Sequence, residues 1–271
     1  MDAGSPGLRT AWAGRALSTL ADSDSNRHPL AKARLPHGAF LPRRLGNATF
    51  PTFAKWNFQM SKTLKVDVFT DVVCPWCLIG SARLDKALAE LPDDVVVEVE
   101  NHPFYLDPNV PPEGVVVADM LRQKYGREPK DMWARVESEA EKAGIDLDLS
   151  QQPRMYPTAK AHTLTRLAKP LGTQHALANA IAEAYFLDHR QINDNTVLAD
   201  LAAAHGFDRD EALRLINDPQ ELAITEGIAT AAAAQGISGV PFFVFGEKYS
   251  MSGAQPQEVF GMALEKTLSE L

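Results

Sequence analysis

Only two cysteines occur in the 271 residues of the chain, Cys74 and Cys77, and they stand three positions apart. Chance alone gives a pair of residues this spacing in about 0.7% of arrangements, so the spacing indicates a function. Because there is no third cysteine, no other disulfide can form within the chain. A single C-x-x-C pair predicts chemistry at one place, either thiol–disulfide exchange or metal binding.

The cysteines stand between a predicted strand and a predicted helix. Residues 64–71 (LKVDVFTD) alternate apolar and polar side chains, and from Pro75 to Leu91 apolar residues recur at helical spacing. Proline suits the first helical turn, which needs no N–H. A thiolate at this junction faces unpaired N–H groups and the positive end of the helix dipole, which favours Cys74 as the nucleophile. Cys77 follows one turn later and more deeply buried, so we expect it to resolve the mixed disulfide.

Two other roles for the cysteines stay open at this point. One is a buried thiol pair without a function. The other is a zinc or iron–sulfur site, which needs four ligands, whereas the chain has no second C-x-x-C and no paired-histidine motif. We therefore predict no metal, while a metal bridged by two subunits stays open. The remaining histidines weighed as ligands are scattered: His102, His162, His175, His189 and His205.

The rest of the pattern predicts a strand–helix–strand unit, a long helical block and a strand–strand–helix unit. Further strands are expected at 95–100, 240–246 and 248–252, and a last helix at 255–268. Neither unit can bury a sheet alone, so we predict an α/β thioredoxin fold (βαβ…ββα) with a large inserted α-helical domain. The thioredoxin-fold domain comprises 62–108 and 236–271, and the inserted helical domain 109–235. Helices of the block are expected at 117–125, 130–143, 159–168, 174–187, 196–205, 208–216 and 221–234.

A Val-Pro step, Val240-Pro241, opens the last unit. A proline that begins a strand has no N–H for the ladder, and taken alone it predicts an ordinary strand start. Together with the C-x-x-C pair and this order of elements, it predicts a cis Val240–Pro241 bond. Such a bond would leave the Val240 backbone free to pair with an extended substrate.

The first 59 residues differ from the rest in charge. They hold eight basic and three acidic residues, against 19 and 32 in residues 60–271. No apolar segment follows a basic start, which argues against a secretory signal, and scattered prolines interrupt the amphipathic helix of a transit peptide. We predict that 1–59 is a disordered or mis-translated extension, with a transit peptide as the alternative. The net charge of −8 argues against a nucleic-acid partner, and no apolar stretch approaches the roughly 20 residues of a membrane span.

Short motifs occur in order through residues 62–270: Asp71-Val-Val-Cys74-Pro-Trp-Cys77 with Gly80, Phe104-Tyr-Leu-Asp-Pro108, Lys124-Tyr-Gly126, Ala161-His162, Ala184-Tyr-Phe186, Gly239-Val-Pro-Phe-Phe243 and Ser252-Gly-Ala-Gln255. With these motifs the chain resembles the DsbA branch of the thioredoxin superfamily, in particular its FrnE-like group. The resemblance implies thiol–disulfide oxidoreductase activity. It also implies that Cys74 is the nucleophile, Cys77 the resolving thiol and Pro241 the cis-proline.

The chain departs from this family at three places, one of which is Tyr156-Pro157-Thr158, where the family usually has an Asn beside the Thr. Val68 stands six residues before Cys74, where related proteins often keep a buried carboxylate. Asp71 is a candidate proton acceptor for Cys77, although we interpret it as a solvated carboxylate at the strand end, and His162 as a structural histidine. Pro-Trp separates the cysteines, without the histidine that stabilises the thiolate of the periplasmic oxidant, so strong oxidising power is not predicted.

The sequence thus predicts an enzyme, a cytoplasmic protein disulfide oxidoreductase that acts on protein or small-molecule thiols and disulfides. The predicted catalytic residues are Cys74 and Cys77, and the predicted substrate-binding residues are Pro75, Trp76, Val240 and Pro241. No cofactor beyond the redox-active Cys74–Cys77 disulfide is predicted. Glutathione as reductant or co-substrate stays open, as does a homodimer. The alternatives are a glutathione-dependent isomerase or transferase, of the kappa-class or 2-hydroxychromene-2-carboxylate isomerase type, and a peptide-binding, chaperone-like module.

Overall fold

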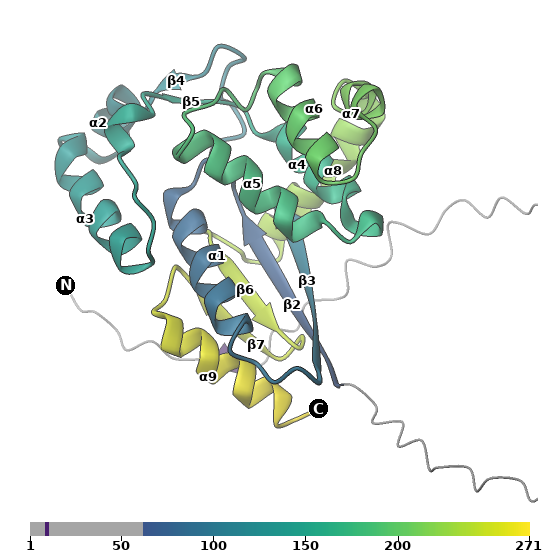
Figure 1. The fold of residues 1–271 in the computed structure, drawn as a ribbon. Coiled ribbons are helices and arrows are strands. Elements are labelled where there is room, and N and C mark those ends of the chain that lie inside the picture. The colour runs from purple at the N-terminus through teal and green to yellow at the C-terminus, as the bar shows by residue number, and fades with distance from the viewer. Residues whose placement is uncertain (1–8, 11–61) are drawn as a thin grey trace, which may run out of the picture. The chain divides into compact units, whose positions relative to one another are not determined.

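A five-stranded sheet organises the part of the chain that the computed structural model describes, residues 9–10 and 62–271 (Figure 1). Its strands are β1 (Arg9–Thr10), β2 (Lys62–Thr70), β3 (Val95–Pro103), β6 (Phe242–Phe245) and β7 (Tyr249–Ser252). Their order is β1-β7-β6-β2-β3, in which β2 and β3 are parallel and all other neighbours antiparallel. The predicted extension 1–59 lies outside the described residues except for 9–10, which form a short strand that the sequence did not predict.

Two helices, α1 (Pro75–Leu88) and α9 (Gln257–Leu268), pack against each other and cover one face of the sheet (Figure 1). Apolar side chains from β2, β6, β7 and these helices form one buried core, which includes Val66, Leu84, Phe243 and Phe260. The unit β2-α1-β3 joins the unit β6-β7-α9 through the antiparallel pair β2–β6. This arrangement confirms the predicted α/β fold of βαβ and ββα units.

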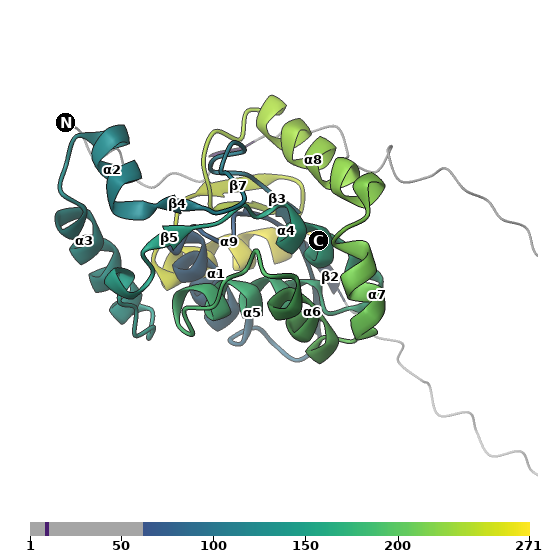
Figure 2. The same ribbon diagram turned by 90° about the horizontal axis from the view of Figure 1, so that it is seen from above.

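The segment between β3 and β6 is mostly helical, as predicted. Its helices are α2 (Val117–Tyr125), α3 (Pro129–Lys142), α4 (Ala159–Leu167), α5 (Gln174–Phe186), α6 (Asn195–Ala204), α7 (Arg209–Leu215) and α8 (Pro219–Ala234). Figure 2 shows α4 to α8 gathered beside β3, whereas α2 and α3 stand apart from them. We call α2, α3 and the turn between them the arm.

The arm is held at its base and along α3. Two short strands at its base, β4 (Val115–Val116) and β5 (Arg154–Met155), pair antiparallel. The sequence predicted no strands here, because two residues are too few to show alternation. Arg83 of α1, although buried, donates from Nη2 to Glu139 Oε2 of α3 at 2.7 Å and from Nη1 to the Ala254 carbonyl at 2.7 Å. The bond to Glu139 ties the arm to the helix that begins at the cysteines, and the bond to Ala254 ties this helix to the segment between β7 and α9.

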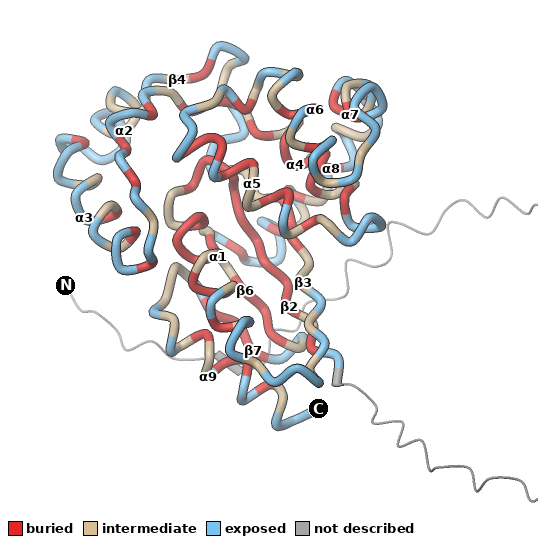
Figure 3. Tube along the Cα trace, in the orientation of Figure 1, coloured by how far each residue is buried: buried red, intermediate tan, exposed pale blue. Residues whose placement is uncertain are grey.

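Helix α1 is buried along much of its length (Figure 3), and its buried side chains belong to two cores. Its second half contributes Leu84 and Ala87 to the core of the sheet. Its first half contributes Leu78 and Ile79 to a second core, which the residues of the helical segment complete. The start of α1, where the cysteines lie, therefore packs with the second core, and the two cores meet farther along the helix.

Candidate active site

The two cysteines lie at the N-terminus of α1, as predicted. Cys74 has extended backbone angles (φ −94°, ψ 112°) and caps the helix with its backbone, and Pro75 takes the first helical position. The Cys77 N–H donates to the Cys74 carbonyl at 2.9 Å, which fixes the two residues one turn apart. Both thiols are free. Cys74 is 4% and Cys77 3% exposed, so both side chains are buried and their exposed fractions hardly differ.

The two sulfurs differ in their surroundings instead. Cys74 lines a large cavity together with Pro75 and Trp76. Cys77 faces a second, small cavity behind the helix, of about 10 Å³. Burial raises the pKa of the Cys77 thiol well above its ordinary value of 9.0, and the hydrogen bond and charge of Cys74 raise it further. Cys77 is thus held as a protonated thiol and does not line the large cavity.

The Val-Pro step lies beside Cys74. The Val240–Pro241 peptide bond is cis, and the Cys74 Sγ lies 3.8 Å from the Val240 carbonyl oxygen. Helix α1 approaches this segment closely at Gly80, where an added Cβ would lie 3.0 Å from Pro241 Cγ and 3.1 Å from the ring of Phe243. The absence of a side chain at Gly80 therefore sets the distance between the cysteine helix and Pro241.

A buried carboxylate and a histidine lie under the cysteines. Asp71 is 2% and His162 3% exposed, and Asp71 Oδ1 lies 3.2 Å from His162 Nε2. Asp71 Oδ2 also accepts from the Leu106 N–H at 2.9 Å. The interpretation of Asp71 as a solvated carboxylate is wrong, because α4 and the loop after β3 cover it. His162 is a satisfied, buried histidine, as interpreted, but its partner places it at the active site.

Asp71 also lies close to Cys77. The Asp71 backbone acts to lower the pKa of the Cys77 thiol, whereas the charge of the Asp71 carboxylate raises it. Burial, and to a smaller extent the charges of Asp71 and Glu226, raise the pKa of Tyr105 to about 12. Asp71 and Cys77 both line the small cavity, together with the polar side chains of Thr70, Ser81, Asn101 and Asn179. This cavity is about large enough for one water molecule, with hydrogen-bonding groups on its walls.

The large cavity, of about 780 Å³, separates Cys74 from the arm. Trp76 forms part of its wall and is half-buried, with the Arg135 guanidinium 5.7 Å from its ring centre. Tyr185 and Phe186, interpreted as core residues, are buried in the second core and also line this cavity. Sequence periodicity marks such residues as apolar, but it does not show that a space lies between the elements that carry them.

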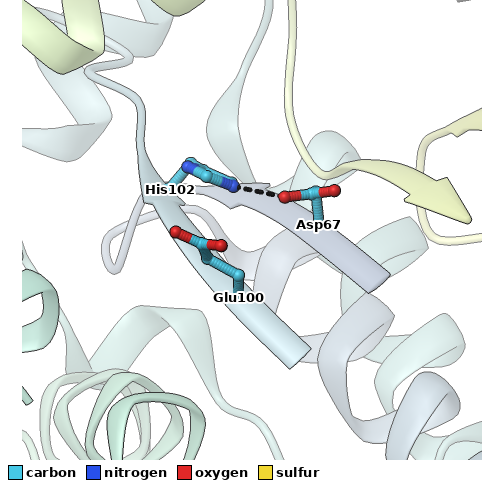
Figure 4. Close-up of side chains that lie close together, drawn as sticks. All are labelled: Asp67, Glu100 and His102. Atoms are coloured by element: carbon cyan, nitrogen blue, oxygen red, sulfur yellow. Dashed lines mark hydrogen bonds and ion pairs between the residues drawn. The ribbon is translucent and has the colours of Figure 1, made fainter. Parts of the chain in front are cut away.

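A third group of titratable residues lies on the sheet, away from the cysteines: Asp67 of β2 and Glu100 and His102 of β3 (Figure 4). These are residue types that bind metals, but basic side chains already pair with their carboxylates. His102 Nε2 lies 2.8 Å from Asp67 Oδ1, Lys169 Nζ lies 2.6 Å from Glu100 Oε1, and Lys65 Nζ lies 3.3 Å from Asp67 Oδ1. A cation would have to displace these partners, so the group does not fit an open metal site.

Comparison with known proteins matches this geometry. The sequence profile of the family described as "DSBA-like thioredoxin domain" matches residues 65–265. A probable DsbA oxidoreductase from Streptomyces coelicolor is 35% identical, with a TM-score of 0.69 over 77% of this chain and 91% of that one. An uncharacterised protein of Bacillus subtilis (strain 168), YwbO, is 28% identical over 74% of this chain and 96% of its own length.

A more distant structure shares the fold alone. It is the cytosolic disulfide reductase DsbM of Pseudomonas aeruginosa, solved with GSH, which is 18% identical with a TM-score of 0.52. The match covers 76% of this chain and 96% of that one.

Proposed function

Because the chain belongs to the family of DsbA-like thioredoxin domains, we propose that it is a thiol–disulfide oxidoreductase that works through Cys74 and Cys77. The observation that carries the proposal is the difference between the two sulfurs. Cys74 lies at the helix N-terminus and on the large cavity, whereas Cys77 is enclosed and its pKa is raised. One sulfur is thus placed to meet a substrate, and the other to act only after the first has reacted.

In the proposed reaction the Cys74 thiolate attacks one sulfur of a substrate disulfide. That S–S bond breaks, one substrate thiolate leaves, and a mixed disulfide joins Cys74 to the other half. Cys77 then attacks the Cys74 sulfur and releases the second thiolate, which leaves a Cys74–Cys77 disulfide. Two electrons pass from the protein to the substrate, and the reverse sequence oxidises a dithiol.

The proton of Cys77 must leave during the second step, since only its thiolate is a nucleophile. We place Asp71 in the role of proton acceptor, directly or through the small cavity that both residues line. The His162 imidazole at 3.2 Å from Asp71 holds the carboxylate in position. A group buried beside a thiol of raised pKa is suited to this transfer.

Pro75, Trp76, Val240 and Pro241 serve as the substrate-binding residues of the proposal. Pro75, Trp76 and Val240 line the large cavity with Cys74, and the Val240 carbonyl lies beside the Cys74 sulfur. A substrate chain that reaches Cys74 would therefore pass along the Val240 backbone, where extended peptides are able to pair. Membership of the FrnE-like group stays a prediction.

An assay of insulin reduction in the presence of dithiothreitol tests the proposal with two variants, one of each cysteine. Cys74→Ser should abolish the activity, and Cys77→Ala should accumulate a mixed disulfide that mass spectrometry detects. Activity of Cys74→Ser equal to that of the parent would refute the exchange mechanism. Equilibration of the parent with glutathione buffers then gives the reduction potential, and with it the favoured direction.

A glutathione-dependent isomerase or transferase is the second candidate. The structural similarity to a disulfide reductase solved with GSH is the observation that favours it. It predicts saturable glutathione binding and an activity that survives Cys77→Ala, because activation of glutathione needs no resolving thiol. Glutathione as the reductant of the Cys74–Cys77 disulfide fits the first proposal equally well, and loss of turnover in Cys77→Ala separates the two.

Location and assembly remain proposals as well. Among residues 9–10 and 62–271, the structure contains no helix that is long and apolar enough to cross a membrane. We propose the cytoplasm, the compartment in the name of the DsbM reductase, where exchange at a C-x-x-C pair is transient and catalytic. Fractionation of cells checks the compartment, and sedimentation of the purified chain checks the predicted homodimer.

A further inference from the structure

The cavity beside Cys74 has the size of a small-molecule site. Its volume of about 780 Å³ lies within the roughly 300–1,000 Å³ of pockets that bind small organic ligands. Its walls are mostly apolar, and they include many aromatic rings and flexible thioethers. These are the rings of Trp76, Phe104, Tyr105, Tyr125, Trp133, Tyr185 and Phe186 and the side chains of Met120, Met132 and Met155.

The arm supplies an apolar face that the rest of the described chain covers only in part, since Val117 and Met120 pack against the second core but stay half-buried. Val117, Met120, Leu121 and Lys124 follow the i, i+3, i+4, i+7 spacing of one face of α2, and all four line the cavity. A surface helix normally buries its apolar face in the core, yet α2 has no buried residue. Covering this face with an apolar ligand would remove its surface from water, which is favourable.

Few polar side chains line the same walls, and among them the buried Tyr105 hydroxyl has no hydrogen-bond partner in the described part of the chain. Gln152 already donates to the Tyr185 carbonyl, and the Tyr185 hydroxyl donates to the Arg154 carbonyl at 2.8 Å. The charged side chains among the lining residues are Asp107 and Lys124, which is also 5.6 Å from the ring of Tyr125. Beyond the Val240 backbone, a peptide in this space would find few partners for its N–H and C=O groups, which is costly. An aromatic molecule has no such groups to satisfy.

We propose that this cavity binds the aromatic body of a small organic disulfide and presents its S–S bond to Cys74. The proposal rests on the proposed function, because it names the substrate class of that exchange. The aromatic group R of R–S–S–R lies against the rings and thioethers of the walls. Cys74 forms a bond to one sulfur and releases R–S⁻, and Cys77 releases the second. The two electrons come from the protein dithiol, which a small-molecule thiol such as dithiothreitol restores.

Single-turnover kinetics of the reduced protein test this substrate class. Dithiodipyridine is the aromatic disulfide, and hydroxyethyl disulfide is the polar, aliphatic one. Each rate constant is divided by that of free glutathione with the same disulfide, which removes the difference in intrinsic reactivity. Leu121→Trp fills the cavity from α2, and Leu171→Trp is the matched control, because Leu171 is 46% exposed and does not line the cavity.

Leu121→Trp should lower the rate with dithiodipyridine about tenfold more than the rate with hydroxyethyl disulfide, as expected for loss of apolar binding. Leu171→Trp should change neither rate. Equal losses with both disulfides, or no loss with either, would overturn the proposal. So would a loss of insulin reduction as large as that with dithiodipyridine, because the cavity would then serve protein substrates.

A second measurement uses the parent protein and so does not depend on the folding of a variant. Bibenzyl has the two rings of an aromatic disulfide but carbon in place of sulfur, so it cannot react. It should inhibit the reduction of dithiodipyridine competitively, and its binding by calorimetry should persist in Cys74→Ser. Failure of bibenzyl to bind would refute the substrate class. Reduction of hydroxyethyl disulfide by Cys74→Ser would instead refute the proposed function, so the two failures are distinguishable.

Discussion

Gly80 offers a direct test of how the fold positions the active site. An alanine Cβ at this position would lie 3.0 Å from Pro241 Cγ, 3.1 Å from Phe243 Cζ and 3.5 Å from Pro241 Cβ. Ordinary contacts between carbon atoms lie at about 3.5–4.0 Å. Neither the proline ring nor the buried phenylalanine can turn away freely, so α1 and the Val240–Pro241 segment must move apart.

Two effects of Gly80→Ala on the free energy of unfolding oppose each other. Alanine in place of glycine inside a helix stabilises by about 0.5–1 kcal/mol. Overpacking of a well-packed contact costs about 1–3 kcal/mol. Gly261 in α9 separates them, because an added Cβ there has no atom within 4 Å outside its own helix and chain neighbours. We expect Gly80→Ala to be less stable than Gly261→Ala by about 1–3 kcal/mol, the cost of overpacking alone.

Urea unfolding of the two variants and the parent gives this difference, and exchange with hydroxyethyl disulfide gives the effect on the site. The rate of Gly80→Ala should fall about threefold or more, because small displacements of a positioned group reduce reaction rates strongly. Gly261→Ala should keep the rate of the parent. If Gly80→Ala gained stability as Gly261→Ala does, the close approach to Pro241 would not exist, and the reasoning about this contact would be wrong.

Three further predictions concern buried charges. Asp71→Asn should slow the release of the second substrate thiolate about tenfold or more, as loss of a general base does, and a mixed disulfide with an unchanged lifetime would contradict the role of Asp71. Burial acts to raise the pKa of Asp67, but the hydrogen bond and charge of His102 and the charge of Lys65 outweigh it and lower that pKa. The resulting stability is present above the unfolded pKa and is lost as the pH falls through the folded one. The loss of stability caused by Asp67→Asn, measured by urea unfolding, should therefore be larger at about pH 6 than at about pH 3, and equal losses would contradict it. Arg83→Met should cost about 2 kcal/mol or more, because Glu139 and the Ala254 carbonyl lose a charged donor, and Glu139→Gln should cost less by the same measurement.

The order of the long strands and helices could be predicted from the sequence, because in each of them apolar residues recur at the spacing typical of a strand or of a helix. The position of the cysteines at a strand–helix junction followed from the same periods and from Pro75. The short strands β1, β4 and β5 could not be predicted in this way, since their pairing depends on partners distant in the sequence. Their two-residue lengths leave no pattern to read.

The environment of Asp71 shows a second limit of the sequence. Its position three residues before Cys74 could be read directly, but its burial depends on Leu106 and on His162, which lies 91 positions away. Nothing in the local pattern distinguishes a carboxylate at an exposed strand end from one that a distant helix covers. The large cavity could not be predicted for the same reason. It is a space between elements rather than a property of any one of them.

Segments that are distant in the sequence supply different parts of the active site. The βαβ and ββα units supply both sulfurs, Gly80 and Pro241, whereas the helical segment supplies His162 and most walls of the large cavity. Substrate contacts on α2 lie on the large cavity, while the groups that surround Cys77 lie on the small one. Substitutions on the cavity side of α2 should therefore change which disulfides react without changing the pKa of Cys77. A sequence that varied only in the arm would keep the exchange chemistry and acquire a different substrate.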